Sequence, residues 1–138
     1  MDHDNPFKTN RTTLDNLPET KDIAPDVQIG ETSRVTGSVR IGAQTTIDNC
    51  IIRGPVIIGQ NCRLKDTYVG PYTSLGNNVK IVDSEIENTI VYEGTSISDI
   101  EDRIQDSIIG AHTRIVRVKI QPAIFQFRVG ENSFIEIV

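Results

Sequence analysis

The sequence predicts an all-β chain that folds as a parallel β-helix of the hexapeptide type. The main observation is that an aliphatic residue returns every five to seven positions between Ile29 and Ile115. A small side chain stands two residues before nearly every one of them, as Thr45 stands before Ile47, and glycine often follows. Because a strand alternates its faces with a period of two, the small and aliphatic side chains of each repeat point into the same core. Glycine marks the corners at which the chain turns tightly.

A period near six indicates short strands separated by corners, and three such strands close one triangular coil. Every third aliphatic residue then falls on the same vertical ladder. Ladder 1 holds Ile29, Ile47, Leu64, Ile81, Ile97 and Ile115; ladder 2 holds Val35, Ile52, Val69, Ile86 and Ile104; ladder 3 holds Ile41, Ile58, Leu75, Val91 and Ile109. The ladders predict about five coils, with a stacked height of roughly 25 Å. Spacing does not set the hand of the helix; known hexapeptide helices are left-handed, and this resemblance predicts a left-handed β-helix here.

The 138 residues are predicted to form one domain with three segments. Residues 1–26 are an N-terminal tail and lead-in, in which residues 9–17 (TNRTTLDNL) form a short helix or turn. Residues 27–117 form the β-helix, with a bulge at the seven-residue step from Ile97 to Ile104. Residues 118–138 form a β tail that caps the open end or mediates association.

The C-terminal tail concentrates the aromatic residues of the chain. It holds three of the four phenylalanines, Phe125, Phe127 and Phe134. The open end of a β-helix exposes unpaired backbone and apolar side chains, which must be covered to prevent aggregation. Aromatic side chains also anchor protein interfaces. We therefore expect a homo-oligomer formed through these three phenylalanines.

Composition narrows the classes of partner. The formal net charge of −5 argues against a nucleic-acid groove or an anionic membrane surface, so neither nucleic acid nor membrane is an expected partner. No apolar stretch is long enough to span a bilayer, and the first twenty residues are too polar for a signal peptide. A cytoplasmic location is therefore predicted. Only 5% of residues are aromatic, which fits a narrow prism interior.

Residues suited to metal, thiol or cofactor chemistry are few. An open catalytic zinc site built from histidines alone needs three of them. The chain has two, and one of these, His3, falls in the N-terminal tail. Cys50 and Cys62 occupy small inward positions on different ladders, which predicts two buried thiols rather than a disulfide or nucleophile. The glycines stand singly at corners and precede no helix, so they form no phosphate loop. No metal and no cofactor are expected.

His112 is the only candidate catalytic residue. A coenzyme A acyltransferase with a β-helix uses a histidine general base in a cleft between subunits. His112 lies between the inward positions Ile109 and Thr113 and is therefore predicted to point outward, in the last coil. We predict a surface histidine, with a catalytic role only if the chain is an acyltransferase.

Several strings resemble one hexapeptide group in particular. They are IRGPVIIG (52–59), YVGPYTSLG (68–76), IENTIVYEG (86–94), RIQDSIIG (103–110) and VGENSFIEI (129–137). The chain is similar in these strings to the C-terminal β-helix domain of long-form glucose-1-phosphate thymidylyltransferases, which make dTDP-glucose from dTTP and glucose 1-phosphate. Residues 9–17 resemble the helix by which that family leaves its catalytic domain, so the resemblance runs from about residue 9 to residue 137.

The resemblance omits the catalytic half of that family. Its glycine-rich loop (G-x-G-x-R-L-x-P-x-T) and its sugar-binding and metal-binding acidic residues match no position in the sequence. We therefore expect a non-catalytic β-helix domain, either excised from such an enzyme or separately encoded, that mediates oligomerisation or regulation of a sugar-nucleotide pyrophosphorylase and contacts its catalytic domain. Two alternatives remain: a hexapeptide acyltransferase acting on a sugar nucleotide through His112, and a free-standing β-helix scaffold.

Overall fold

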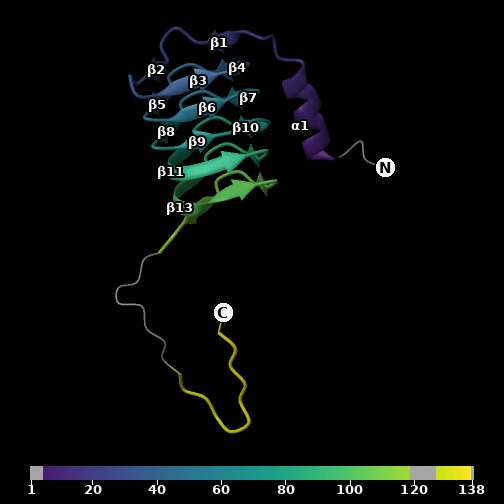
Figure 1. Ribbon diagram of the computed structural model, residues 1–138, viewed down its shortest axis with the longest axis vertical. Helices are drawn as coiled ribbons and strands as arrows, with labels where there is room; N and C mark the ends of the chain where they lie inside the picture. The colour runs from purple at the N-terminus through teal and green to yellow at the C-terminus, as the bar shows by residue number, and fades with distance from the viewer. Residues whose placement is uncertain (1–4, 119–126, 138) are drawn as a thin grey trace.

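A computed structural model describes residues 5–118 and 127–137, and it shows a solenoid of parallel strands beside one N-terminal helix (Figure 1). The elements are α1 (Pro6–Asp15), β1 (Lys21–Ile23), β2 (Gln28–Ile29), β3 (Arg34–Thr36), β4 (Val39–Ile41), β5 (Thr46–Asp48), β6 (Ile51–Arg53), β7 (Val56–Ile58), β8 (Arg63–Lys65), β9 (Tyr68–Val69), β10 (Thr73–Leu75), β11 (Lys80–Glu87), β12 (Ile90–Val91), β13 (Ser96–Gln105), β14 (Ile108–Ile109) and β15 (Arg114–Val116). The predicted parallel β-helix is confirmed.

Strand pairing follows the predicted ladders. One sheet has six strands in the order β1-β4-β7-β10-β12-β14, so the solenoid makes about six turns. On ladder 1, Ile47 pairs with Leu64, and Leu64 pairs with Ile81. The predicted bulge is also present, because the pairing of β11 with β13 shifts register between Ser84 and Ile86.

The first turn begins earlier than the sequence pattern indicates. Strand β1 pairs with β4 in parallel, and Ile23 stands opposite Ile41. Residues 21–23 thus join the solenoid although residues 1–26 are expected as a lead-in. The physical reason is that Ile23 extends ladder 3 one hexad before Ile29, although Lys21 replaces the usual small residue.

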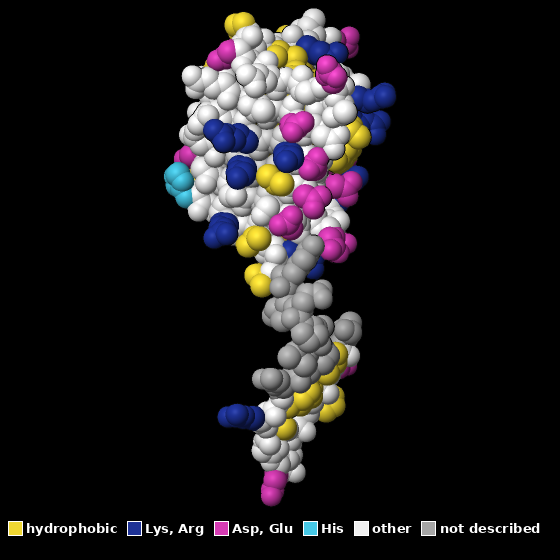
Figure 2. All heavy atoms as spheres, turned by 90° about the vertical axis from the view of Figure 1, so that its left-hand side faces the viewer, with side chains coloured by type: hydrophobic (Ala, Val, Ile, Leu, Met, Phe, Trp, Pro, Cys, Tyr) yellow, Lys and Arg dark blue, Asp and Glu magenta, His cyan; other side chains and the backbone are white. Residues whose placement is uncertain are grey.

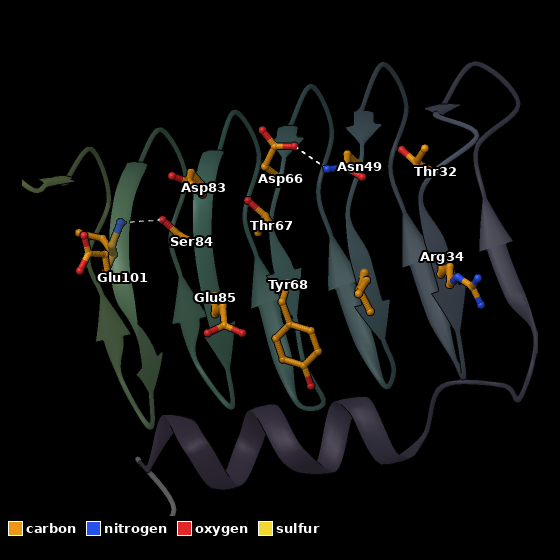
Figure 3. Close-up of a pocket in the computed structure, with 12 residues that line it drawn as sticks. Thr32, Arg34, Asn49, Asp66, Thr67, Tyr68, Asp83, Ser84, Glu85 and Glu101 are labelled. Carbon is orange, nitrogen blue, oxygen red and sulfur yellow. Dashed lines mark hydrogen bonds between the residues drawn. The ribbon is translucent and has the colours of Figure 1, made fainter.

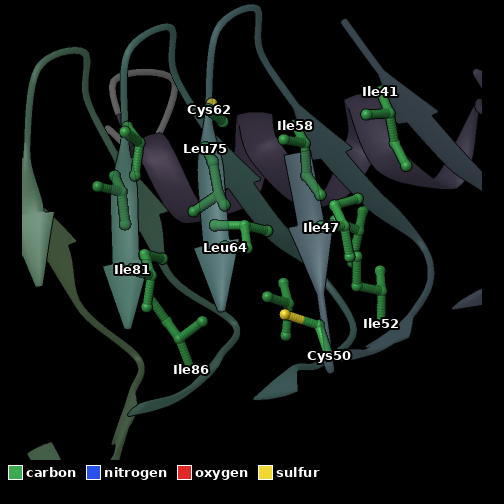
Figure 4. Close-up of a cluster of buried hydrophobic side chains, with 14 of the residues drawn as sticks. Ile41, Ile47, Cys50, Ile52, Ile58, Cys62, Leu64, Leu75, Ile81 and Ile86 are labelled. Carbon is green, nitrogen blue, oxygen red and sulfur yellow. The ribbon is translucent and has the colours of Figure 1, made fainter. Parts of the chain in front are cut away.

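The core is a narrow column of aliphatic side chains (Figure 4). Inner members such as Ile47, Ile52 and Ile81 are 0% exposed. Full burial of one such side chain is worth about 1.5–3 kcal/mol. The small inward residues close the corners by hydrogen bonds; the Thr45 hydroxyl, for example, donates to the carbonyl of Gly59 at 2.9 Å. Each turn is therefore held to the next by packing and by backbone acceptors.

Asn and Asp residues shape the corners. Asn61 and Asn78 have φ of 55° and 60°, in the left-handed region that short polar side chains tolerate best after glycine. They are 17 residues apart and stack, since Nδ2 of Asn61 donates to Oδ1 of Asn78 at 2.7 Å. Asn49 donates to Asp66 in the same way at a second corner. A 17-residue recurrence of Asn and Asp is the sequence signal for these corners.

Helix α1 runs beside the stacked turns (Figure 1). It starts at Pro6, earlier than residue 9, because Asn5 caps it: the Asn5 side chain accepts from the amide of Phe7 at 3.0 Å. On its inner side Leu14 is 1% exposed. Burial of Leu14 and the N-cap together stabilise a helix that is too short to persist alone.

The described part of the tail lies apart from the solenoid (Figures 1 and 2). Residues 127–137 form no strand, so this part does not show the predicted β tail. Phe134 is 86% exposed and Phe127 is 53% exposed. Phe125, the third predicted contact residue, lies outside the described residues. Because β pairing needs a partner strand, alternation of side chains alone does not make a strand here.

Candidate functional site

His112 lies at a corner of the last turn. Its φ is +58°, and its amide donates to the carbonyl of Glu93 at 2.9 Å. The imidazole stacks on Gly94, where an added Cβ would stand 2.2 Å from Nδ1. The residue is exposed, as its position predicts, and is the cyan side chain at the surface in Figure 2. The structure thus presents the His112 ring to solvent at a corner.

Cys50 and Cys62 are buried and unpaired, as the sequence predicts. The thiol of Cys50 donates to the carbonyl of Asp48 at 3.2 Å, and that of Cys62 donates to the carbonyl of Gly76 at 3.2 Å. Burial raises the pKa of both thiols, which outweighs the opposing hydrogen bonds. A raised pKa keeps them protonated, and a protonated thiol is a poor nucleophile.

An open hollow of about 500 Å³ lies on one face of the solenoid (Figure 3). The outward residues that precede successive members of ladder 2 line it: Arg34, Ile51, Tyr68 and Glu85. Strand alternation puts each of them outside because the next residue points inward. The hexad pattern predicts the ladder but not this outward column, whose signal in the sequence is a recurrence every 17 residues.

Arg103 precedes Ile104 of ladder 2 and is therefore the next member of this column. Its guanidinium lies 4.6 Å from the centre of the Tyr68 ring. It also forms ion pairs of 3.4 Å with Glu85 and 3.5 Å with Glu87, and the Tyr68 hydroxyl donates to Glu87 at 3.3 Å. These groups are partly exposed, so each contact contributes little alone. Together they hold the Tyr68 side chain in place, with Arg103 over its ring and Glu87 at its hydroxyl.

A second feature joins α1 to the solenoid at Tyr72. Its hydroxyl donates to Asp15 at 2.7 Å, and the guanidinium of Arg11 lies 4.0 Å from its ring centre. The Asn10 amide donates to the carbonyl of Tyr72 at 3.0 Å, and the hydroxyl of Ser74 donates to Asn10. The hydrogen bond to Asp15 raises the pKa of Tyr72. The string GPYTS, which reads as a rigid turn in sequence, is therefore also the anchor of the helix.

A second open hollow lies beside α1. It has a volume of about 810 Å³ and is lined by Leu14, Leu17, Pro55 and neighbouring residues, and His112 lines neither hollow. Within residues 5–118 and 127–137, no group of three or more His, Cys, Asp or Glu could hold a metal ion. In the same part of the chain, no helix has the length and apolarity to cross a bilayer.

Comparison with known proteins identifies the relatives of the chain. It is 33% identical over 133 residues to a glucose-1-phosphate thymidylyltransferase of Streptomyces antibioticus, which covers 95% of this chain and 35% of that protein. It is 34% identical over 131 residues to the Streptomyces griseus protein of the same name, with 95% and 36% covered. The bifunctional protein GlmU of Shouchella clausii is 28% identical over 86 residues, or 62% of this chain and 19% of that protein. No protein-family model matches the chain.

A solved structure shares the fold. It is a histidine-to-alanine mutant of GDP-perosamine N-acetyltransferase from Caulobacter crescentus, in complex with CoA and GDP-perosamine. It superposes with a TM-score of 0.56 at 25% identity and covers 80% of this chain and 55% of that one. The chain spans about a third of the length of the thymidylyltransferases that it matches, and it is related to their C-terminal β-helix part.

Proposed function

We propose that this chain, as a relative of the C-terminal third of glucose-1-phosphate thymidylyltransferases, is a non-catalytic β-helix module that holds together or regulates a sugar-nucleotide pyrophosphorylase. One observation carries the proposal: the match covers 95% of this chain but 35% of its relative. The site geometry supports it, because the conspicuous features of the described residues are surfaces and anchors rather than a nucleophile with its base.

A second copy of this chain is the proposed first partner. Apolar side chains of the tail are exposed, among them Val129 at 60%, Phe134 at 86% and Ile137 at 56%. Contiguous exposed apolar surface is typical of an association site. Self-association through the tail would bring together whatever domains the β-helix carries.

A nucleotidyltransferase catalytic domain is the proposed second partner. Support comes from α1, whose attachment through Tyr72 to Asp15 and Asn10 fixes the helix on the solenoid. A helix held in this way would transmit a defined orientation to a domain attached on its side of the module. The flexible-linker alternative would need no such contacts.

Sedimentation velocity of the full chain at about 1–100 µM tests self-association. The expected result is a species larger than the monomer in this range, the concentrations at which a protein interface of ordinary affinity is populated. The same preparation should release no pyrophosphate from dTTP and glucose 1-phosphate. A monomer throughout, or pyrophosphate above the blank, contradicts the proposal.

An acetyltransferase acting on a sugar nucleotide is a second candidate, which the likeness to GDP-perosamine N-acetyltransferase favours. His112 would be its general base, and loss of a general base costs about 10²–10⁴ in rate. Acetyl transfer from acetyl-coenzyme A that is lost in His112→Ala would establish this candidate. No transfer, with an unchanged melting temperature in acetyl-coenzyme A, would remove it.

A further inference from the structure

The described tail repeats one corner of the solenoid in sequence. Residues 129–135 read VGENSFI, and residues 109–115 of the last turn read IGAHTRI. Both have an aliphatic residue followed by glycine, two corner residues, a small hydroxyl residue, one outward residue and a second aliphatic residue. The hexapeptide pattern, which stops at Ile115, thus resumes at Val129.

The same seven residues also adopt the geometry of a solenoid corner. Asn132 has φ of 60°, and His112 at the equivalent position has φ of 58°. The Ser133 hydroxyl donates to the carbonyl of Gly130 at 2.7 Å, and the Thr113 hydroxyl donates to the carbonyl of Gly110 at 2.8 Å. The corner therefore forms in a segment that lies apart from the solenoid, so it is ready to stack.

Glycines that directly follow ladder-3 residues indicate that, in the described part of the chain, no turn stacks on the last one. A Cβ on Gly42 would lie 2.7 Å from the carbonyl carbon of Gly59, and a Cβ on Gly59 would lie 2.7 Å from that of Gly76. Each glycine thus allows the backbone of the next turn to approach closely. At Gly110 a Cβ would meet nothing within 4 Å. Tyr92 interrupts this column, but the glycine returns at the last turn, where no further turn covers it.

Among residues 5–118 and 127–137, the backbone hydrogen bonds between turns stop at the same place. One series runs from each turn to the next: Thr46 to Cys62, Arg63 to Val79, Lys80 to Thr95 and Ser96 to Thr113, at 2.9–3.0 Å from amide to carbonyl. The next donor is the amide of Arg114, and the matching acceptor in the tail is the carbonyl of Ser133. A return series ends with His112 donating to Glu93, and its next member would join the Asn132 amide to the carbonyl of Ala111.

We propose that residues 129–137 of one copy stack as an additional turn on the C-terminal end of a second copy. Val129 would extend ladder 3 above Ile109, and Ile135 would extend ladder 1 above Ile115. Within one copy the segment stands away from the end of its own solenoid (Figure 1), and Val129 and Ile135 are 60% and 45% exposed. A second copy supplies the surface that each lacks. This inference rests on the proposed self-association and specifies its geometry.

Strand addition of this kind uses main-chain hydrogen bonds for affinity and alternate side chains for specificity. If every copy gives one tail and receives one, the contact closes in a symmetric pair or ring. The inward residues Val129 and Ile135 would then carry the contact. Phe134 is the most exposed apolar residue of the segment, at 86%. In the stacked turn it would point outward and would not carry the contact.

This difference between neighbours gives the test. Ile135→Asp places a carboxylate in the new core layer and should weaken association about a hundredfold or more, measured by sedimentation velocity. Phe134→Asp makes the same chemical change at the next residue and should preserve association. Both variants should fold, and their single copies should melt at the same temperature as a single copy of the wild type, because the segment lies apart from the solenoid of its own copy.

The accepting end is tested by Gly110→Ala. The added methyl group fills open space in a single copy, where nothing lies within 4 Å, and should leave folding intact. It would clash with an arriving turn and should weaken association. An equal mixture of Gly110→Ala and Ile135→Asp should regain part of the association, because the tail of the first fits the end of the second.

The outcomes separate this inference from the function that it extends. A full chain that stays monomeric contradicts both. An oligomer that survives Ile135→Asp and Gly110→Ala leaves self-association standing and overturns the stacked turn. An oligomer lost in Phe134→Asp alone identifies an aromatic patch instead. A monomer in which Ile135→Asp lowers the melting temperature would show stacking on the chain's own end, which also overturns the exchange.

Discussion

The hydroxyl of Tyr72 donates a 2.7 Å hydrogen bond to Oδ1 of Asp15, a residue 57 positions earlier in the chain. This contact holds the C-terminal end of α1 against the corner that precedes β10, the fourth strand of the six-stranded sheet. Arg11 lies over the same ring. Tyr72 therefore links the helix to the solenoid by both its hydroxyl and its ring.

We expect Tyr72→Phe to loosen α1 while leaving the solenoid folded. The ring and its contact with Arg11 remain, but the bond to Asp15 is lost. Amide hydrogen exchange should speed up in residues 6–15 and stay unchanged in β7 and β10. Equal protection of the helix in both proteins would show that the hydroxyl contributes nothing.

Alkaline pH should have the same effect on the wild-type protein. The hydrogen bond raises the pKa of Tyr72 above its ordinary value of about 10. A group with a raised pKa in the folded state contributes its full stabilisation below the unfolded pKa and loses it as pH rises through the folded pKa. The protection of α1, measured as its exchange rate relative to the intrinsic rate at the same pH, should therefore fall above about pH 10 in the wild type, and Tyr72→Phe should lack this fall.

Core position determines the response to a buried charge. Ile58 and Leu75 are 1% and 2% exposed, so Ile58→Asp or Leu75→Asp should cost about 3 kcal/mol or more and abolish soluble folded protein. Ile51 is 49% exposed on the outer column, so Ile51→Asp is the matched control and should change the free energy of unfolding by about 0.5 kcal/mol or less. Circular dichroism during thermal unfolding measures all three. Normal folding of the two core variants would contradict the ladder assignment.

A further prediction concerns Asn61, a corner residue whose backbone lies in the left-handed region of φ and ψ. Because its φ is 55°, Asn61→Val should destabilise the solenoid by about 1–2 kcal/mol, since a β-branched residue is strained there. Asn61→Gly relieves the backbone and removes only the bond to Asn78, so it should cost less. If urea denaturation finds the glycine variant the less stable of the two, the side-chain bond rather than φ governs this corner.

The solenoid could be predicted from sequence because its contacts repeat. Each ladder residue meets a partner 16–18 positions away, as Ile58 meets Ile41 and Leu75, so one period specifies the register of the sheets. The hexad also places Cys50 and Cys62 inside. Helix α1 starts before the expected residue 9 because Asn5 caps it and Pro6 suits its first position, and neither residue belongs to the string at 9–17.

The candidate sites were less predictable because their contacts do not repeat. Nothing in local sequence brings Asp15 to Tyr72, because this pair depends on where α1 returns along the solenoid. Arg103 and Tyr68 lie two turns apart on one outward column, so the ladders bring them near each other without specifying the contact of their side chains. The sequence predicts association through Phe125, Phe127 and Phe134, that is, through an aromatic surface of the tail. The hexad count does not extend to the corner at 129–135, because the interval from Ile115 to Ile135 is 20 residues, longer than one turn.

The most direct test of the account is the solution mass of the full chain beside a chain lacking residues 121–138, measured by light scattering across about 1–100 µM. The account predicts a multiple of the 15.3 kDa protomer mass for the full chain. It predicts a monomeric or aggregating product after the deletion, since the tail supplies the contact and its loss leaves the last turn open. A full chain that remains at the protomer mass over the whole range would contradict it.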